Sequence, residues 1–206
     1  MNTRTEYDRL FDLYMPIGIA VGVLVGGFII AAALRGRRRR RPARREGATR
    51  TEVLLAVVVT AIAGVLLGFT VQGDHAIHEL DASPGVVVDV TAYEWGWNFA
   101  YPASGVSVDS SQGGTPVLGV PTGTPVRIRL RTRDVIHAFF VPDRRFKHDA
   151  FPGRVFQFDL RWDHPGTSEG HCAEFCGLHH DRMTFEVRAM TPADFQAWLA
   201  SQRSAT

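Results

Sequence analysis

Apolar and charged residues are distributed unevenly along this 206-residue chain. Two runs near the N-terminus, 14–34 and 53–72, contain no charged residue. A helix of about 20 apolar residues crosses the hydrocarbon core of a bilayer, so the two runs predict transmembrane helices. A pair of buried helices in a soluble protein is the alternative for both runs. A signal peptide is an alternative for the first, although its charged flank follows the apolar residues instead of preceding them.

After residue 73 the pattern changes to short segments with a two-residue period. In 125–131, Val and Ile and Leu occupy one face and three Arg occupy the other, which predicts a half-buried antiparallel strand. Segments 154–162 and 183–190 also place apolar side chains on one face, and 85–94 is rich in β-branched residues. Gly- and Pro-rich joints separate these segments. The pattern therefore predicts a β-sandwich or barrel.

The last segment returns to a helical period. Thr191–Asp194 reads as a helix start, with Thr191 as the N-cap, Pro at the first helical position and Asp194 at the third. Phe195, Trp198 and Leu199 then form an apolar stripe. We expect a short C-terminal helix that packs on the β domain or on a partner.

The charge of the chain differs between its two parts. The net charge of +2 is the sum of +6 over 1–72 and −4 over 73–206, and eight Arg fall within 35–45. The positive-inside rule places the loop 35–52 in the cytoplasm, and hence 1–13 and the β domain on the extracytoplasmic side. The apolar runs on both sides of the Arg cluster favour contact with anionic lipid over binding of nucleic acid.

The protein has two cysteines, Cys172 and Cys176, which are too few for a disulfide framework. Such a close pair is compatible with a disulfide, a redox pair or a metal site. His180 and Met183 follow closely, and His137 lies upstream in another predicted strand. Two Cys and two His would satisfy zinc, but a thioether is a usual weak ligand of copper and contributes nothing to structural zinc.

The second cysteine bears on how many copper ions this set would hold. A mononuclear blue-copper site uses one Cys, two His and an axial Met. Two thiolates can instead bridge two copper ions, each with one imidazole. Such a pair shares an electron with little change of geometry, which suits electron transfer. A disulfide between Cys172 and Cys176 stays the alternative.

Residues 172–183 carry the pattern C-x-E-x-C-x3-H-x2-M. This resembles the dinuclear copper A motif of subunit II of cytochrome c oxidase and related heme-copper oxidases. The sequences DVIHAFFVP at 134–142, KHDAFPGR at 147–154 and EWGWNF at 94–99 are similar to the same family. The resemblance implies a mainly β chain, a cupredoxin-like barrel or sandwich at 73–206 that follows a two-helix transmembrane hairpin, in a bacterial cell membrane.

The resemblance also implies the roles of the metal ligands. Cys172 and Cys176 bridge two copper ions, and His137 and His180 are the terminal imidazoles. Met183 is the weak ligand of one copper ion.

Three further residues receive roles by resemblance. The backbone carbonyl of Glu174 serves the second copper ion, and its carboxylate a magnesium ion at the interface with subunit I. Trp95 is implied as the residue where electrons enter; a core Trp at the barrel edge is the alternative. Glu52 is implied as the entrance of a proton path; a charge at a helix N-terminus is the alternative. Gly96 and Leu55 depart from the pattern of the family around these last two residues.

The implied function is that of an electron-transfer subunit. It accepts electrons from cytochrome c and passes them to heme in subunit I of a multi-subunit oxidase, which reduces oxygen to water and pumps protons. The chain has no evident heme ligands of its own, so oxygen chemistry belongs to a partner. The alternatives are the copper A subunit of a related nitric oxide reductase and a membrane-tethered copper carrier or assembly factor.

Overall fold

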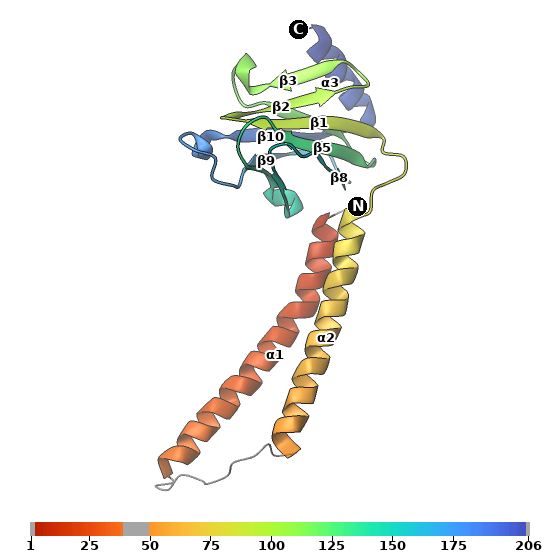
Figure 1. Cartoon of the computed structure of the whole chain (residues 1–206). Helices are drawn as coiled ribbons and strands as arrows, with labels where there is room; N and C mark the ends of the chain where they lie inside the picture. The colour runs from red at the N-terminus through yellow and green to blue at the C-terminus, as the bar shows by residue number, and fades with distance from the viewer. Residues whose placement is uncertain (1–2, 39–49, 205–206) are drawn as a thin grey trace. The chain divides into compact units, whose positions relative to one another are not determined.

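The computed structural model describes residues 3–38 and 50–204, which form a helical unit and a β unit (Figure 1). The helical unit, Glu6–Asp74, contains most of α1 (Thr3–Arg38) and α2 (Arg50–His78). Both predicted apolar runs lie inside these helices. The predicted loop 35–52 is helical at both of its ends, and its residues 39–49 lie outside the described part of the chain.

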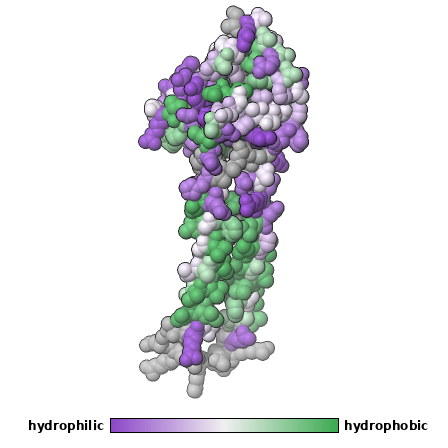
Figure 2. All heavy atoms as spheres, turned by 90° about the vertical axis from the view of Figure 1, so that its right-hand side faces the viewer, coloured by the Kyte–Doolittle hydropathy of each residue, from purple (hydrophilic) through white to green (hydrophobic). Residues whose placement is uncertain are grey.

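Both helices are long and apolar enough to cross a membrane. The most apolar window in each has a mean hydropathy of 2.6, and none of either window is buried. Figure 2 shows hydrophobic residues along much of the helical unit. Phe28 and Leu54 of this unit are 68% and 63% exposed. Helices of a soluble core bury such side chains, so the structure favours the membrane interpretation of these runs.

Polar and close contacts join the two helices. The Tyr14 hydroxyl lies 2.9 Å from the carbonyl oxygen of Leu66 and 2.6 Å from the Thr70 hydroxyl. The Leu10 side chain lies against Gly73, where an added Cβ would come within 3.1 Å of it. Small residues and interhelical hydrogen bonds are the usual means by which membrane helices associate, so these contacts stabilise the hairpin.

The β unit consists of two five-stranded sheets, ordered β3-β2-β1-β5-β8 and β4-β10-β9-β6-β7. The strands are β1 (Val86–Tyr93), β2 (Gly96–Tyr101), β3 (Val106–Asp109), β4 (Val117–Pro121), β5 (Val126–Thr132), β6 (His137–Val141), β7 (Phe146–Ala150), β8 (Phe156–Leu160), β9 (Gly166–Cys172) and β10 (Thr184–Met190). Strand β5 pairs antiparallel with β8 but parallel with β1. The prediction of an antiparallel strand is thus wrong on one side, because three strands, β2, β3 and β4, lie between β1 and β5 in the chain.

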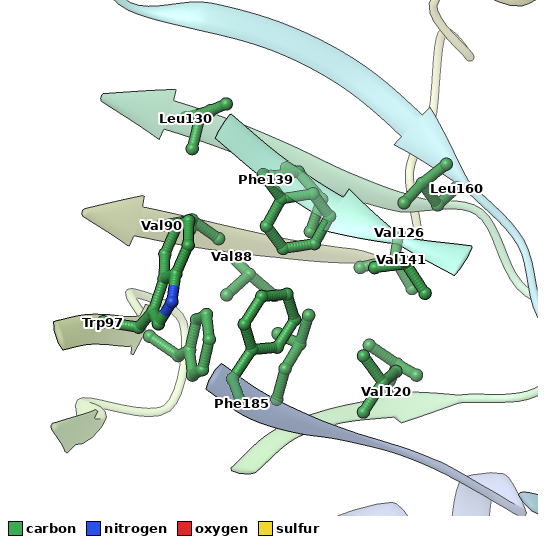
Figure 3. Packing of buried hydrophobic residues seen from close by; sticks show 14 of the residues in the cluster. Val88, Val90, Trp97, Val120, Val126, Leu130, Phe139, Val141, Leu160 and Phe185 are labelled. Carbon is green, nitrogen blue, oxygen red and sulfur yellow. The ribbon is translucent and has the colours of Figure 1, made fainter. Parts of the chain in front are cut away.

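Aromatic and branched side chains from both sheets fill the space between them (Figure 3). Along β5, Val126, Ile128 and Leu130 are fully buried, as their alternation with Arg predicts. The centre holds fully buried aromatic rings, with Phe139 stacked on Phe185 at 5.0 Å between ring centroids. Cys172, Cys176 and Met183 belong to the same buried cluster as these rings.

Strands β2, β3, β4, β7 and β9 were not predicted. Strand β9 reads GTSEGHC and has no apolar alternation. It forms because it pairs with β10 and β6, and its Gly170 lies opposite Phe185. A Cβ at Gly170 would come within 2.2 Å of the Phe185 ring, so this position has room only for glycine.

The C-terminal helix α3 (Pro192–Ser204) begins as predicted. The Asp194 backbone N–H donates to the Thr191 hydroxyl at 3.2 Å, and that hydroxyl donates to the Asp194 carboxylate at 2.6 Å. Phe195 and Leu199 are buried, and Trp198 packs over Gly119 of β4. The helix therefore packs on the β unit itself.

An ion pair fixes the edge strand β8 to β5. The Asp159 carboxylate accepts hydrogen bonds from the Arg127 guanidinium, at 2.9 Å to each oxygen, and from the Asp81 backbone N–H at 2.6 Å. Burial by itself raises the pKa of Asp159, but these donors outweigh burial and the pKa is lowered. A carboxyl group whose pKa is lower in the folded state stabilises the fold above its unfolded pKa.

We expect Asp159→Asn to lower the unfolding free energy at pH 7 by about 1.5–3 kcal/mol. The difference from wild type should shrink as the pH falls below about 4, where the unfolded carboxyl group takes up its proton, and vanish below the folded pKa. Urea unfolding of the full chain in detergent, followed by tryptophan fluorescence from pH 7 to pH 3, measures it. A difference that stays constant over this range would contradict the assignment.

Candidate metal centre

The segment from Cys172 to Met183 is a loop closed on itself by backbone hydrogen bonds. Cys172 ends β9, and Met183 immediately precedes β10. The Cys172 N–H donates to the Met183 carbonyl at 2.9 Å, and the His180 N–H to the Gly177 carbonyl at 3.2 Å. Gly177 has φ +112°, a conformation that favours glycine. The loop therefore brings both of its ends, and the ligand residues on them, to one place.

His137 reaches this place from a different strand. It is the first residue of β6, which pairs with β9 so that Phe139 lies opposite Cys172. Its ring is fully buried, with Nδ1 3.7 Å from the Cys172 sulfur and Nε2 2.8 Å from the Asp134 carboxylate. Asp134 thus orients the ring, a role the sequence interpretation missed although the spacing D-x-x-H carries it.

The five predicted ligand side chains converge. The Cys176 sulfur lies 3.8 Å from the Cys172 sulfur, 3.5 Å from His180 Nδ1 and 3.8 Å from the Met183 sulfur. The ligand atoms of His137, Cys172 and Cys176 all lie within 4.8 Å of one another. Both cysteines are free thiols, whereas a disulfide would bring the sulfurs to about 2.05 Å. The structure therefore gives no support to the disulfide alternative.

The donor set fits copper. Cys172 and Cys176 are each 4% exposed and Met183 is 1% exposed, so the sulfur atoms face one another away from water. The two thiol sulfurs and the thioether are soft donors, and imidazole nitrogens are also donors that copper binds. Four of these groups would complete a zinc tetrahedron and would leave the thioether without a role as a ligand.

Burial and mutual proximity shift the pKa values of the two thiols in opposite directions. Burial raises the pKa of Cys172, but hydrogen bonds from His137 and from backbone groups outweigh burial and lower it overall. Burial, followed by the neighbouring Cys172 thiolate, raises the pKa of Cys176. Two uncompensated negative charges are unfavourable at this distance in a buried pocket, and a bound cation removes that penalty.

Glu174 presents two groups in different directions. Its backbone carbonyl accepts a hydrogen bond from the Cys172 thiol at 3.2 Å. Its carboxylate pairs with Lys147, which also contacts Asp149 at 3.1 Å. The carbonyl is therefore beside the sulfur cluster, and the carboxylate belongs to a charged group at the edge of the site.

Two tryptophans support the loop from β2 and the turn before it. The Trp95 indole N–H donates to the Cys176 carbonyl at 3.0 Å. The Trp97 indole N–H donates to the Met183 carbonyl at 3.4 Å, so that carbonyl accepts two hydrogen bonds. Sequence interpretation singled out Trp95 and missed Trp97. Glu52 lies in the first turn of α2, in the helical unit, and its role stays a prediction.

Comparison with known proteins decides the family. A family model described as cytochrome C oxidase subunit II, periplasmic domain, matches residues 113–190. The probable cytochrome c oxidase subunit 2 of Streptomyces avermitilis is 32% identical over an alignment of 239 residues, gaps included. The alignment covers 94% of this chain and 75% of the relative. The chain belongs to the cytochrome c oxidase subunit 2 family. It is therefore subunit II of a heme-copper oxidase, part of an oxidoreductase complex.

Solved structures agree with a subunit II fold. The periplasmic domain of subunit II of cytochrome oxidase (CoxB) of Bradyrhizobium japonicum has a TM-score of 0.56 and 25% identity, and the match covers 61% of this chain and 99% of that one. A chain of a heme-copper terminal oxidase dimer has a TM-score of 0.50 and 20% identity, covering 68% and 98%. The predicted cupredoxin-like fold after two apolar helices is confirmed. This subunit 2 is a membrane protein with an extracytoplasmic domain.

Proposed function

We propose that this subunit accepts electrons from cytochrome c at a dinuclear copper centre and passes them to heme in subunit I. There oxygen is reduced to water, coupled to proton pumping. The observation that carries the proposal is the convergence of two thiols, two imidazoles and a thioether in one buried pocket, in a member of the subunit 2 family. One cysteine too many for a single blue-copper ion favours two bridged ions.

In this proposal Cys172 and Cys176 would hold both copper ions, His137 and His180 would hold one each, and Met183 would be a weak ligand. A copper pair of this kind takes up and releases one electron with little change of geometry. The chain itself prepares the pocket: the closed loop excludes water, and Asp134 orients the buried imidazole of His137. Preorganised ligands keep the geometry nearly constant between the two oxidation states.

Groups at the edge of the pocket have proposed roles in passing charge. The Glu174 carbonyl, 3.2 Å from the Cys172 sulfur, is placed to serve the second copper ion. Its carboxylate would bind a magnesium ion at the subunit I interface, displacing Lys147. Trp95 would take electrons from cytochrome c, since its indole N–H contacts the Cys176 carbonyl.

The helical unit would anchor the subunit in the bacterial plasma membrane. We propose spans at 14–34 and 53–72, with 1–13 and the domain from 73 outside and the Arg-rich loop 35–52 in the cytoplasm. The eight Arg within 35–45 support this orientation and contact with anionic lipid. Glu52, at the cytoplasmic end of α2, would then stand at the mouth of a proton path into subunit I.

Copper loading of the full chain in detergent, under reducing conditions before metal addition, tests the proposal. We expect two copper ions per chain and a paramagnetic spectrum split by two equivalent copper nuclei. One copper ion per chain with a blue-copper spectrum, or tighter binding of zinc, would overturn it. Rapid loss of copper to a chelator would instead support the copper-carrier alternative, and nitric oxide reduction by the purified complex would support the nitric oxide reductase alternative.

A further inference from the structure

The Trp95 side chain is held on three sides. Its indole N–H donates to the Cys176 carbonyl at 3.0 Å. The indole edge formed by Nε1, Cε2 and Cζ2 lies against Gly177, where an added Cβ would come within 3.1 Å of Cζ2. The third contact is the His179 ring, edge-on at 4.9 Å between centroids and 85° between planes. Two of these contacts come from backbone, and Trp95 also packs against the buried core. His179 therefore supplies a loop side-chain contact that a substitution can remove.

Adjacent histidines on this loop face different partners. His180 opens a short 3₁₀ helix, His180–Arg182, and its Nδ1 lies 3.5 Å from the Cys176 sulfur. His179 precedes that helix, and its carbonyl accepts a hydrogen bond from the Arg182 N–H at 3.0 Å. This turn sends the His180 ring into the sulfur cluster and the His179 ring onto Trp95. The position of His179 is thus set by the same backbone that places a metal ligand.

We propose that His179 is a positioning residue that keeps the Trp95 indole hydrogen-bonded to the Cys176 carbonyl. The inference rests on the proposed function, in which reduced cytochrome c is oxidised and its electron would pass to the copper ions that Cys176 would hold. From the indole N–H the connection runs through one hydrogen bond and then through covalent bonds of Cys176 alone. If the indole rotates away from this carbonyl, the hydrogen bond is lost and the electron has to cross a solvent-filled gap.

The size of the effect follows from the strength of an aromatic edge contact. Such pairs change the population of the packed conformer by roughly two- to tenfold. His179→Ala should therefore lower the ratio of hydrogen-bonded to released Trp95 by that factor. His179→Phe keeps an aromatic edge at the same place and should restore it. Leu178→Ala is the matched control, because Leu178 is the neighbouring residue and is 79% exposed.

The first measurement uses the metal-free full chain in lipid nanodiscs. Solvent exchange of the Trp95 indole N–H is followed by NMR, with its signal assigned by its loss in Trp95→Phe. We expect roughly two- to tenfold faster exchange in His179→Ala and wild-type exchange in His179→Phe and Leu178→Ala. Unchanged exchange in His179→Ala would overturn the inference, whether or not the chain binds copper.

The second measurement uses the assembled oxidase and reduced cytochrome c in stopped flow. With His179→Ala, the limiting first-order rate of copper reduction at saturating cytochrome c should fall, by at most roughly two- to tenfold, with an unchanged copper spectrum. His179→Phe should restore the rate. Faster indole exchange with an unchanged limiting rate would overturn the inference while leaving the copper centre intact. Failure of the wild-type chain to bind copper would instead refute the proposed function.

Discussion

Replacing Cys176 with Ser is expected to abolish the dinuclear copper centre and to lower electron transfer from cytochrome c by more than ~100-fold. The Cys176 sulfur is the central donor, within 3.8 Å of the Cys172 and Met183 sulfurs and 3.5 Å from His180 Nδ1. A Ser hydroxyl is similar in size, so the pocket should survive. It is a hard donor that stays protonated, however, and it cannot bridge two copper ions.

Metal content and the paramagnetic spectrum of the purified full chain measure this result. Met183→Leu is the matched control, because Leu fills a similar volume and removes only the weak thioether ligand. That variant should still bind two copper ions per chain with a shifted spectrum. Two copper ions and a shared-electron spectrum in Cys176→Ser would refute the bridging role of Cys176.

The second large effect is a loss of stability on removing a ring from the core that the ligand residues pack against. Phe185→Ala should lower the unfolding free energy by about 3–5 kcal/mol. The Phe185 ring is fully buried and packs against Phe139 at 5.0 Å, Trp97 at 5.1 Å and Phe99 at 5.4 Å between centroids. These rings belong to both sheets, which hold them in place, so the cavity left by the Phe185 ring should stay largely unfilled. Urea unfolding in detergent, monitored by tryptophan fluorescence, gives the difference.

A substitution at Gly170 tests the contact between β9 and the Phe185 ring from the opposite side. Gly170→Ala should destabilise by about 1–3 kcal/mol, since its Cβ would meet the Phe185 ring. In the double variant with Phe185→Ala the two costs should sum to more than the measured loss, because the clash disappears with the ring. Arg188→Ala is the control on the exposed face of β10, the strand that carries Phe185, and should change stability by less than about 0.5 kcal/mol. Additive costs would show that the two residues are not in contact.

The core and the metal site are coupled through one carbonyl. Met183 lies two residues before Phe185, and its carbonyl accepts hydrogen bonds from the Cys172 N–H and the Trp97 indole. Trp97 in turn packs on Phe185. The Phe185 cavity should therefore also loosen the loop that carries the ligands. A site braced by the core in this way suits electron transfer, which requires that ligands move little.

Local patterns alone determined several parts of this protein. Charge-free length predicted the two helices, strict alternation predicted the buried face of β5, and a capping sequence predicted the start of α3. The ligand segment 172–183 could also be predicted from the sequence, because four of the five donor side chains lie on one short loop. In each case the physical signal, a period, a length or a spacing, is contained within a few consecutive residues.

Only the tertiary structure decided the rest. Strand β9 has no apolar period, and its place depends on pairing with β10 and β6. His137 is 35 residues from Cys172 and meets it because these strands are neighbours. The contacts of Trp95 with Cys176 and His179 likewise join distant segments. Such contacts depend on backbone pairing and on close packing across the two sheets, and neither leaves a periodic signal in the local sequence.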